Sequence, residues 1–398
     1  MRRFENRLEY ASKMIENYDS QEPFANYLKE VFKANKQFGS KDRKFYKAAC
    51  FSFFRLGQYG LTLDLKQRIL LGLYFTGEGF SLPDFEEVYQ VYFDMEADDS
   101  KSLKEKFDSV ATEDTPFDKL DVYPFTEETC SVIEIDAFID SVFEPRPIWL
   151  RFAKEEEEKS KAIFVKNGLD IQMMDNYPYL KNGVSLNFVQ NLPYEVQDIG
   201  SQKILDSLEI KNEGTFWDCC AGAGGKSLQL AEKFDGIKLY TSDLRLKALQ
   251  NLLKRYEKYS YPKPMLSVTD LEKEVEAIHF AYDNENELIN HGYFDTIFID
   301  APCTGSGTWA RTPENLTSFD TTDIYLYAEK QFSIVKNALP FLKEEGKLIY
   351  VTCSIFTKEN EEVQAKITKE LGLKCTNSFY IKGYEMQGDN FFIAEFSR

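Results

Sequence analysis

The sequence has 398 residues, of which 43% are apolar, enough material for a sizeable core and for more than one domain. It contains no run of about 18 apolar residues, so it predicts no transmembrane helix. The charged start, Met1–Arg7, lacks the apolar stretch of a signal peptide. We therefore expect a cytoplasmic protein, and we expect it to be a monomer.

The formal net charge of −18, taken as a whole, argues against a nucleic-acid partner. The acidity is concentrated in residues 71–145, whose balance is −16, whereas residues 1–70 carry +6 and residues 146–398 carry −8. Phosphate contacts depend on local patches of positive charge rather than on the total. The net charge therefore does not exclude RNA.

The seven cysteines and two histidines offer little for a metal site. The cysteines are spread along the chain and never take the C-x-x-C spacing of a zinc site. With only His279 and His291, a Ser-His-Asp triad also has few candidates. We expect no metal, and we expect reduced thiols in a reducing compartment.

The first 95 residues are predicted to be helical, because apolar residues recur at helical spacing within 8–15, 24–32, 40–56, 63–75 and 82–93. Residues 96–145 are acidic with weak periodicity, which favours a loosely packed connector.

From Pro147 the pattern changes to a strand at 148–152, a helix at 154–167 and strand-like runs at 169–173 and 184–190. This predicts a small α+β subdomain over residues 146–196. Residues 197–398 then alternate between strand and helix patterns, with strands expected at 215–219, 238–242, 265–268, 294–300 and 347–352. Such alternation is typical of a parallel, doubly wound sheet, so the predicted fold class is α/β with a Rossmann-like domain.

A glycine-rich loop follows the first of these strands and reads DCCAGAGGKS over Asp218–Ser227. A Walker A loop needs glycine where Cys220 stands, so a phosphate-binding P-loop fits poorly. A nucleoside-cofactor loop fits better, because it requires an acidic residue about 20 positions later for ribose hydroxyls, where Asp243 stands. The alternative is a tight structural turn with Asp243 capping a helix. Asp270, after the third strand, is a candidate for the adenine amino group, although Asp commonly caps a helix there.

Two later strands each end in a cysteine. The strand at 294–300 leads into Asp300-Ala-Pro-Cys303, and the strand at 347–352 leads into Cys353. Amino-group methylases would carry Pro-Pro and an aromatic residue after this aspartate, so a cysteine there suggests carbon chemistry. The alternative is that these are ordinary core cysteines.

A pair of thiols suits methylation of cytosine C5, a carbon that is too electron-poor to react unaided. A thiolate that adds to C6 makes C5 nucleophilic. Charge then builds on N3, where a carboxylic acid, Asp300 by position, can stabilise or protonate it. A second thiol can assist the loss of the C5 proton and of the first thiol.

These motifs resemble the Sun/RsmB family of S-adenosylmethionine-dependent RNA cytosine-C5 methyltransferases, whose substrate is 16S rRNA. The likeness covers nearly the whole chain and includes VQDIGSQ at 196–202, RTPE at 311–314, the acid-rich ENE at 359–361 and GDNFFIA at 388–394. One departure is Gly222-Ala223, where many members have Ala-Pro. A second is Ala310, where an arginine is frequent.

The resemblance implies that Cys353 is the nucleophile and that Cys303 promotes product release. It places the cofactor S-adenosylmethionine at Cys220, Ala221, Gly222, Ala223, Gly224, Gly225, Lys226, Asp243, Asp270 and Asp300. It implies RNA contacts by Lys226, Arg311 and Arg151, although Arg151 is equally an exposed strand residue without a role. It also implies that residues 1–95 form a NusB-like RNA-binding domain.

Two alternatives stay open. In the first, the chain is a DNA cytosine-C5 methyltransferase that attacks with Cys303. In the second, it is a non-catalytic RNA-binding factor of ribosome assembly that kept the fold.

Overall fold

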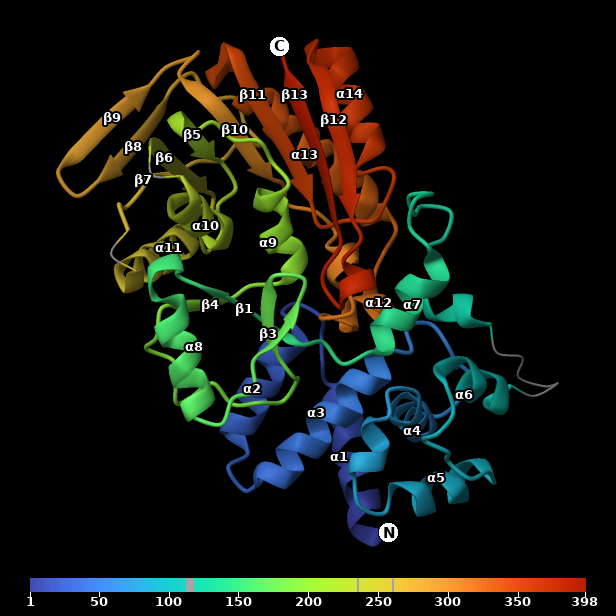
Figure 1. Cartoon of the computed structure of the whole chain (residues 1–398). Coiled ribbons are helices and arrows are strands. Elements are labelled where there is room, and N and C mark those ends of the chain that lie inside the picture. Colours follow the sequence, from blue (N-terminus) through green and yellow to red (C-terminus); the bar gives the residue numbers. More distant parts are fainter. Residues whose placement is uncertain (112–117, 235, 260) are drawn as a thin grey trace. The chain divides into compact units, whose positions relative to one another are not determined.

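The computed structural model describes residues 1–111, 118–234, 236–259 and 261–398 (Figure 1). The chain divides into two compact units. The first unit comprises Met1–Pro145 and Trp309–Asp320, and the second comprises Arg146–Thr308 and Thr321–Arg398.

The first unit is helical over its described residues. Its N-terminal helices bury one apolar stripe each, as Phe4, Leu8 and Ala11 do in the first of them. The third and fourth helices pack closely, because a Cβ on Gly72 would lie 2.2 Å from the backbone oxygen of Ser52. The helices are α1 (Arg2–Glu16), α2 (Phe24–Ala34), α3 (Ser40–Phe54), α4 (Leu65–Phe75), α5 (Phe85–Phe93), α6 (Leu103–Val110), α7 (Ile135–Phe143) and α12 (Glu314–Ser318), with short 3-10 turns at Glu78–Ser81 and Lys119–Val122.

The acidic segment 96–145 belongs to this unit and differs from the loosely packed connector that its charge suggested. Phe107 in α6 is buried and packs its ring 4.4 Å from that of Phe75. Val122 and Phe138 are fully buried. The sequence of this segment shows only weak helical periodicity, because the buried apolar residues that anchor it are few and widely separated. Residues 112–117 lie outside the described residues.

The second unit contains a sheet in which nine described strands follow the order β12-β13-β11-β10-β5-β6-β7-β8-β9 (Figure 1). The five strands from β11 to β7 run parallel to one another, and the outer strands pair antiparallel. The bounds are β5 (Glu213–Asp218), β6 (Gly236–Asp243), β7 (Met265–Val268), β8 (Ile278–Tyr282), β9 (Glu285–Ile289), β10 (Phe294–Asp300), β11 (Leu342–Thr352), β12 (Lys374–Ile381) and β13 (Phe391–Ser397).

Helices cover both faces of this sheet, which is why its central strands are apolar on both sides. The helices α13 (Thr322–Ala338) and α14 (Glu361–Leu371) pack in one core cluster. The helices α9 (Ile199–Asp206), α10 (Gly225–Lys233) and α11 (Leu246–Tyr259) pack in another. Neighbouring strand residues alternate between the clusters, as Leu348 and Tyr350 join the first and Ile349 the second.

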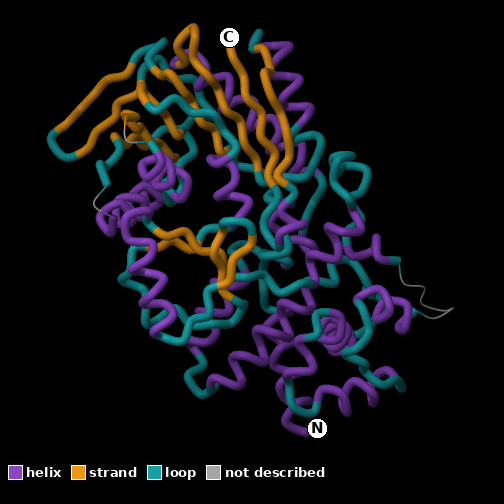
Figure 2. Tube along the Cα trace, in the orientation of Figure 1, coloured by secondary structure: helices purple, strands orange, loops and turns teal. Residues whose placement is uncertain are grey.

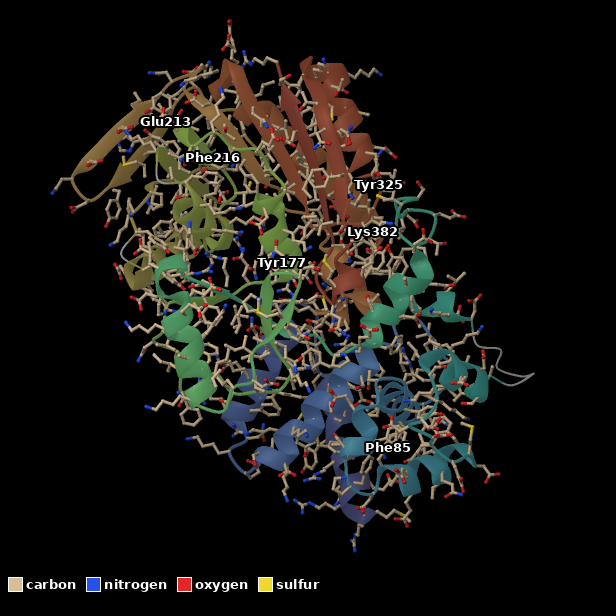
Figure 3. The ribbon with its side chains drawn as sticks, in the orientation of Figure 1. Phe85, Tyr177, Glu213, Phe216, Tyr325 and Lys382 are labelled. Carbon is tan, nitrogen blue, oxygen red and sulfur yellow. The ribbon has the colours of Figure 1, made fainter. Side chains whose placement is uncertain are left out.

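A second, smaller sheet has the strand order β2-β3-β1-β4. Its elements are β1 (Ile148–Phe152), α8 (Glu157–Lys166), β2 (Gln172–Met174), β3 (Tyr177–Leu180) and β4 (Tyr194–Val196), with short 3-10 turns before α8 and elsewhere in this unit at 306–308, 339–341 and 383–386. Figure 2 shows the strands of this unit gathered in two separate groups. Tyr177 of β3 is labelled in Figure 3. Its hydroxyl donates a hydrogen bond to Asp206 at the end of α9, which joins the small sheet to a helix that packs on the larger one.

The α/β class with a Rossmann-like sheet and a helical N-terminal region is confirmed. The expected strand at 184–190 is wrong, because those residues form turns. The antiparallel strands β8, β9, β12 and β13 were not predicted. The strands β8, β9 and β12 lie at or near the sheet edges, where one face meets solvent and the hydrophobic pattern is weak. In β13 the residues from Phe391 to Phe396 are all buried, so it lacks the alternation of a half-exposed strand.

Candidate active site

The candidate site lies where the parallel strands β5, β6, β10 and β11 end, which is the edge at which open α/β sheets bind ligands. A cavity of about 610 Å³ opens there, within the range of small-molecule sites. The cavity is lined by most of the glycine-rich loop, by Asp243 and Asp270, and by Asp300 and Cys303. The structure thus brings together residues that are up to 85 positions apart in the sequence.

The glycine-rich loop turns tightly because two of its glycines adopt positive φ, +55° at Gly222 and +79° at Gly224. The amide of Gly222 donates a hydrogen bond of 2.8 Å to Asp243 Oδ2. Gly224 does not line the cavity; a Cβ there would lie 2.5 Å from Cγ of Leu252 on α11. This glycine therefore serves the packing of the loop against a helix.

Asp243 ends β6 beside the loop, and its side chain is only 8% exposed. Its Oδ1 accepts hydrogen bonds from the backbone amide and from Nε of Arg245, at 2.8 and 3.0 Å. Burial by itself would raise the pKa of Asp243, but the bonds from Arg245 outweigh it and leave that pKa below its usual value. Asp243 is therefore a fixed carboxylate at the cavity wall.

Asp218 ends β5 and is buried beneath the same cavity. Ser227 Oγ donates a 2.5 Å hydrogen bond to its Oδ2, whereas Oδ1 has no hydrogen-bond partner among the described residues. Burial raises the pKa of Asp218 to about 7. A buried carboxyl oxygen without a hydrogen-bond partner costs free energy. A polar ligand in the cavity could supply that partner.

Lys226 and Asp300 form an ion pair of 2.7 Å between the start of α10 and the end of β10. The Lys226 side chain is 13% exposed, and its Nζ lies 5.2 Å from the ring centroid of Phe391. Burial by itself would lower the pKa of Lys226. The interaction with Asp300 and, more weakly, that with Cys353 outweigh burial and leave this pKa above its usual value. Lys226 therefore stays a cation.

Cys303 and Cys353 are free thiols whose sulfur atoms lie 3.1 Å apart. Their strands, β10 and β11, are parallel neighbours that end together, so the pair is a consequence of sheet register. The hydrogen bond with Cys353, with burial next, raises the pKa of Cys303 well above its usual value. Cys303 therefore holds its proton while it is hydrogen-bonded to Cys353.

Asp270 lines the cavity, and its Oδ1 also accepts a 3.1 Å bond from the amide of Glu272. It therefore lies at the cavity wall and also stabilises the turn after β7.

Sequence reasoning missed a rim formed by Glu272 with Tyr327 and Lys330 of α13. Lys330 and Glu272 pair at 2.9 Å. It also assigned no role to Glu359, which is fully buried behind the two cysteines. The sequence did offer a signal for Glu359, an acidic residue shortly after Cys353. It offers no such signal for the rim residues.

Two expected RNA contacts lie elsewhere. Arg151 is 10% exposed, pairs with Glu232 on α10, and donates a 2.7 Å bond from Nε to Gln197 Oε1. This contradicts a solvent-facing role, because the guanidinium joins the small sheet to the larger one. Arg311 is exposed and belongs to the first unit, in the segment Trp309–Asp320.

Within the described ranges, no helix has both the length and the apolar character to cross a membrane. Across the same residues, no group of three or more His, Cys, Asp or Glu side chains is placed to hold a metal ion.

Comparison with solved structures shows a shared fold. The chain aligns with the crystal structure of a protein called PH0851 at a TM-score of 0.69, with 18% identity over 98% of both chains. It aligns with NSun6 from Pyrococcus horikoshii, solved with SFG, at a TM-score of 0.53 and 15% identity, over 66% of this chain and 94% of that one.

Curated relatives are more similar in sequence over shorter stretches. The chain is 31% identical over 169 residues to the probable ribosomal RNA small subunit methyltransferase B of Bacillus subtilis (strain 168), which covers 42% of this chain and 35% of that protein. It is 26% identical over 271 residues to ribosomal RNA small subunit methyltransferase B of Proteus mirabilis (strain HI4320), covering 65% and 61%. These alignments span less than two thirds of the length of either relative.

The family model described as 16S rRNA methyltransferase RsmB/F matches residues 205–379. This stretch contains the glycine-rich loop, the Lys226–Asp300 pair and both cysteines. Residues 205–379 therefore form a methyltransferase domain of the RsmB/F family.

Proposed function

We propose that this chain transfers a methyl group from S-adenosylmethionine to C5 of a cytosine in RNA, and that the RNA is small-subunit rRNA. The observation that carries the proposal is the pair of thiols 3.1 Å apart, of which Cys303 lines a cofactor-sized cavity together with the Lys226–Asp300 ion pair. The names of the curated relatives supply the class of RNA.

The cavity suits S-adenosylmethionine in size and polarity. The small residues from Cys220 to Gly225 let the cofactor approach the backbone closely. Asp243 would accept hydrogen bonds from the ribose hydroxyls, and Asp270 one from the adenine amino group. Asp218 Oδ1 would find a polar partner there. The bound cofactor supplies an electrophilic methyl group.

Cys353 acts as the nucleophile in this proposal. Its thiolate Sγ forms a bond to C6 of the cytosine, and the electron pair of the C5–C6 double bond makes C5 nucleophilic. The Lys226 ammonium stabilises the thiolate before attack. As charge develops at N3, Lys226 passes a proton to the Asp300 carboxylate, and the resulting carboxylic acid protonates N3. Both groups are held in place before the base arrives, so little reorganisation is needed.

Cys303 acts in release. After methylation the C5 proton leaves, and the bond from Cys353 Sγ to C6 breaks with its electron pair returning to sulfur. While Cys353 carries the charge, the hydrogen bond between the sulfurs keeps Cys303 protonated. Once Cys353 is bonded to carbon, that restraint is gone, so Cys303 can release its proton to solvent and its thiolate can then accept the C5 proton.

The target base must be in a loop or flipped out, because C6 is inaccessible to a thiolate within a stacked duplex. The helical first unit, NusB-like by resemblance, is proposed as an RNA-binding domain. Its residues 1–70 carry the positive balance of the chain.

The test incubates wild type, Cys353→Ala and Cys303→Ala with S-adenosylmethionine and small-subunit rRNA. The readouts are 5-methylcytosine and covalent protein–RNA adduct. We expect wild type to methylate, Cys303→Ala to accumulate adduct because release is blocked, and Cys353→Ala to form none.

Adduct in Cys353→Ala and none in Cys303→Ala would move the nucleophile to Cys303 and favour the mechanism of the DNA enzymes. Methylation of a duplex DNA substrate in preference to RNA would support the same alternative. If wild type methylates neither polymer but binds rRNA, the chain is a non-catalytic assembly factor.

A further inference from the structure

Glu359 is a buried carboxylate that the proposed mechanism does not use. It lies in the loop between β11 and α14 and has no exposed surface. Burial raises its pKa, although its hydrogen bonds oppose that shift. A fully buried acid is costly unless hydrogen bonds compensate it, so its partners indicate its purpose.

The carboxylate joins the two loops that carry the thiols. Oε1 accepts a 2.9 Å hydrogen bond from the amide of Thr304, the residue after Cys303, and Oε2 accepts one of 2.5 Å from the hydroxyl of Thr304. Oε2 also accepts a hydrogen bond from the hydroxyl of Ser354, the residue after Cys353. One carboxylate therefore holds the neighbour of each cysteine.

A third element braces this connection. Gln331 of α13 donates from Nε2 both to Glu359 Oε1, at 2.9 Å, and to the backbone oxygen of Pro302, at 3.0 Å. Tyr350 on β11 donates from its hydroxyl to Gln331 Oε1 and to the backbone oxygen of Glu359, at 2.9 and 2.7 Å. The bridge is thus supported on the side away from the cavity.

Other hydrogen bonds also join the two segments. The amides of Gly307 and Ala301 donate to the backbone oxygens of Cys353 and Val351, at 2.9 and 2.8 Å. Ser306 Oγ accepts a 2.9 Å bond from the amide of Ile355 and lies 3.1 Å from Ser354 Oγ, and the hydroxyls of Thr304 and Ser354 lie 3.4 Å apart. None of these bonds holds the backbone amide of Thr304, next to Cys303, which donates to Glu359. The side chain of Glu359 therefore contributes to the orientation of Cys303 toward Cys353.

We infer that Glu359 is a positioning residue, which sets the separation of the Cys303 and Cys353 thiols by holding Thr304 and Ser354 together. The catalytic meaning of that separation rests on the proposed function. Attack by one thiol and release by the other need both sulfurs at one cytosine, and a misplacement of about 1 Å can cost up to about a hundredfold in rate.

The first readout measures the thiol pair without any methyl transfer. Phenylarsine oxide binds two neighbouring thiols, forming two As–S bonds and releasing its oxygen as water with the two thiol protons. Only the complex that Cys303→Ala abolishes is counted, which separates this pair from the other cysteines. We expect Glu359→Ala to weaken it by at least about tenfold, since a cyclic product requires both sulfurs in register.

Two matched variants separate positioning from loss of stability. Tyr350→Phe removes two buried hydrogen bonds from the same network but contacts neither Thr304 nor Ser354, the residues beside the cysteines, so it should keep arsenical binding within about twofold of wild type. Glu359→Gln keeps the size and planarity of the group, and the hydroxyls of Thr304 and Ser354 can turn to accept from its amide. It should restore most of the binding.

The second readout follows the adduct in single-turnover reactions with rRNA. Glu359→Ala should bind S-adenosylmethionine as wild type does by calorimetry, because the carboxylate does not line the cavity. It should slow adduct release more than adduct formation, since Cys303 is the thiol whose loop it frees.

Wild-type arsenical binding by Glu359→Ala overturns the inference, and so does an equal loss in Tyr350→Phe. Should Glu359→Ala not fold, Thr304→Val and Ser354→Ala each remove one hydroxyl of the bridge, and either must weaken the arsenical complex for the inference to stand. If these variants behave as expected but wild type forms no adduct with RNA, the bridge is correct and the proposed function is wrong.

Discussion

Replacing Gly224 by alanine should destabilise the start of α10 by far more than the same change at Gly222, two residues earlier. Both glycines have positive φ, which costs an L-residue about 1–2 kcal/mol. At Gly224 the new methyl would also lie 2.5 Å from Cγ and 3.0 Å from Cβ of Leu252, which is fully buried. At Gly222 the nearest atom is Nη2 of the exposed Arg245, at 3.9 Å.

The overpacking at Leu252 adds about 1–3 kcal/mol, because a buried leucine cannot retreat without moving its helix. The expected loss is therefore about 2–5 kcal/mol for Gly224→Ala and about 1–2 kcal/mol for Gly222→Ala. Hydrogen exchange of the amides in α10 measures this local opening free energy. A global unfolding transition is less suitable, because a chain with two units need not unfold in one step.

Gly224→Ala combined with Leu252→Ala should recover part of the loss, since the clash is removed while the backbone cost persists. Equal protection of α10 in the two single variants would refute the reasoning. That outcome would mean that backbone conformation alone, and not contact with α11, demands glycine in the loop.

Two other substitutions test buried charges. Burial raises the pKa of Asp218 to about 7, from about 3.9 in the unfolded chain, so stability that is present below about pH 4 is lost as the pH rises toward 7. The free energy of unfolding of Asp218→Asn, measured with urea, should therefore rise relative to that of wild type as the pH increases from about 4 to about 7. A difference between the two proteins that does not depend on pH would contradict this prediction. Arg151→Ala leaves Glu232 buried without its cation and should cost about 3–5 kcal/mol in the same assay. The double variant with Glu232→Met should recover most of this, whereas a stable Arg151→Ala that binds rRNA poorly would restore Arg151 as an RNA contact.

Local pattern determined much of this protein. The alternation of strands and helices after residue 197 predicted the parallel sheet, because central strands of such sheets are apolar on both faces. The glycine-rich loop and the two cysteines were placed at strand ends, and parallel strands end at one edge. Their gathering around one cavity therefore followed from the order of elements along the chain.

Tertiary structure alone decided which charged residues face that cavity and which are buried elsewhere. Arg151 and Glu232 are 81 positions apart, and their pairing turns a predicted surface residue into a connection between two sheets. Asp218 and Asp243 both end strands, yet burial raises the pKa of the first while Arg245 lowers that of the second.

The same limit applies to the two thiols. The sequence by itself determined that Cys303 and Cys353 end strands, and by resemblance it implied their unequal roles. The sheet register brought the sulfurs to 3.1 Å, and Glu359 joined the residues that follow them. Separation and burial depend on side chains from three segments that are distant in sequence, after β10, in α13 and around the end of β11, so no local pattern could have supplied them.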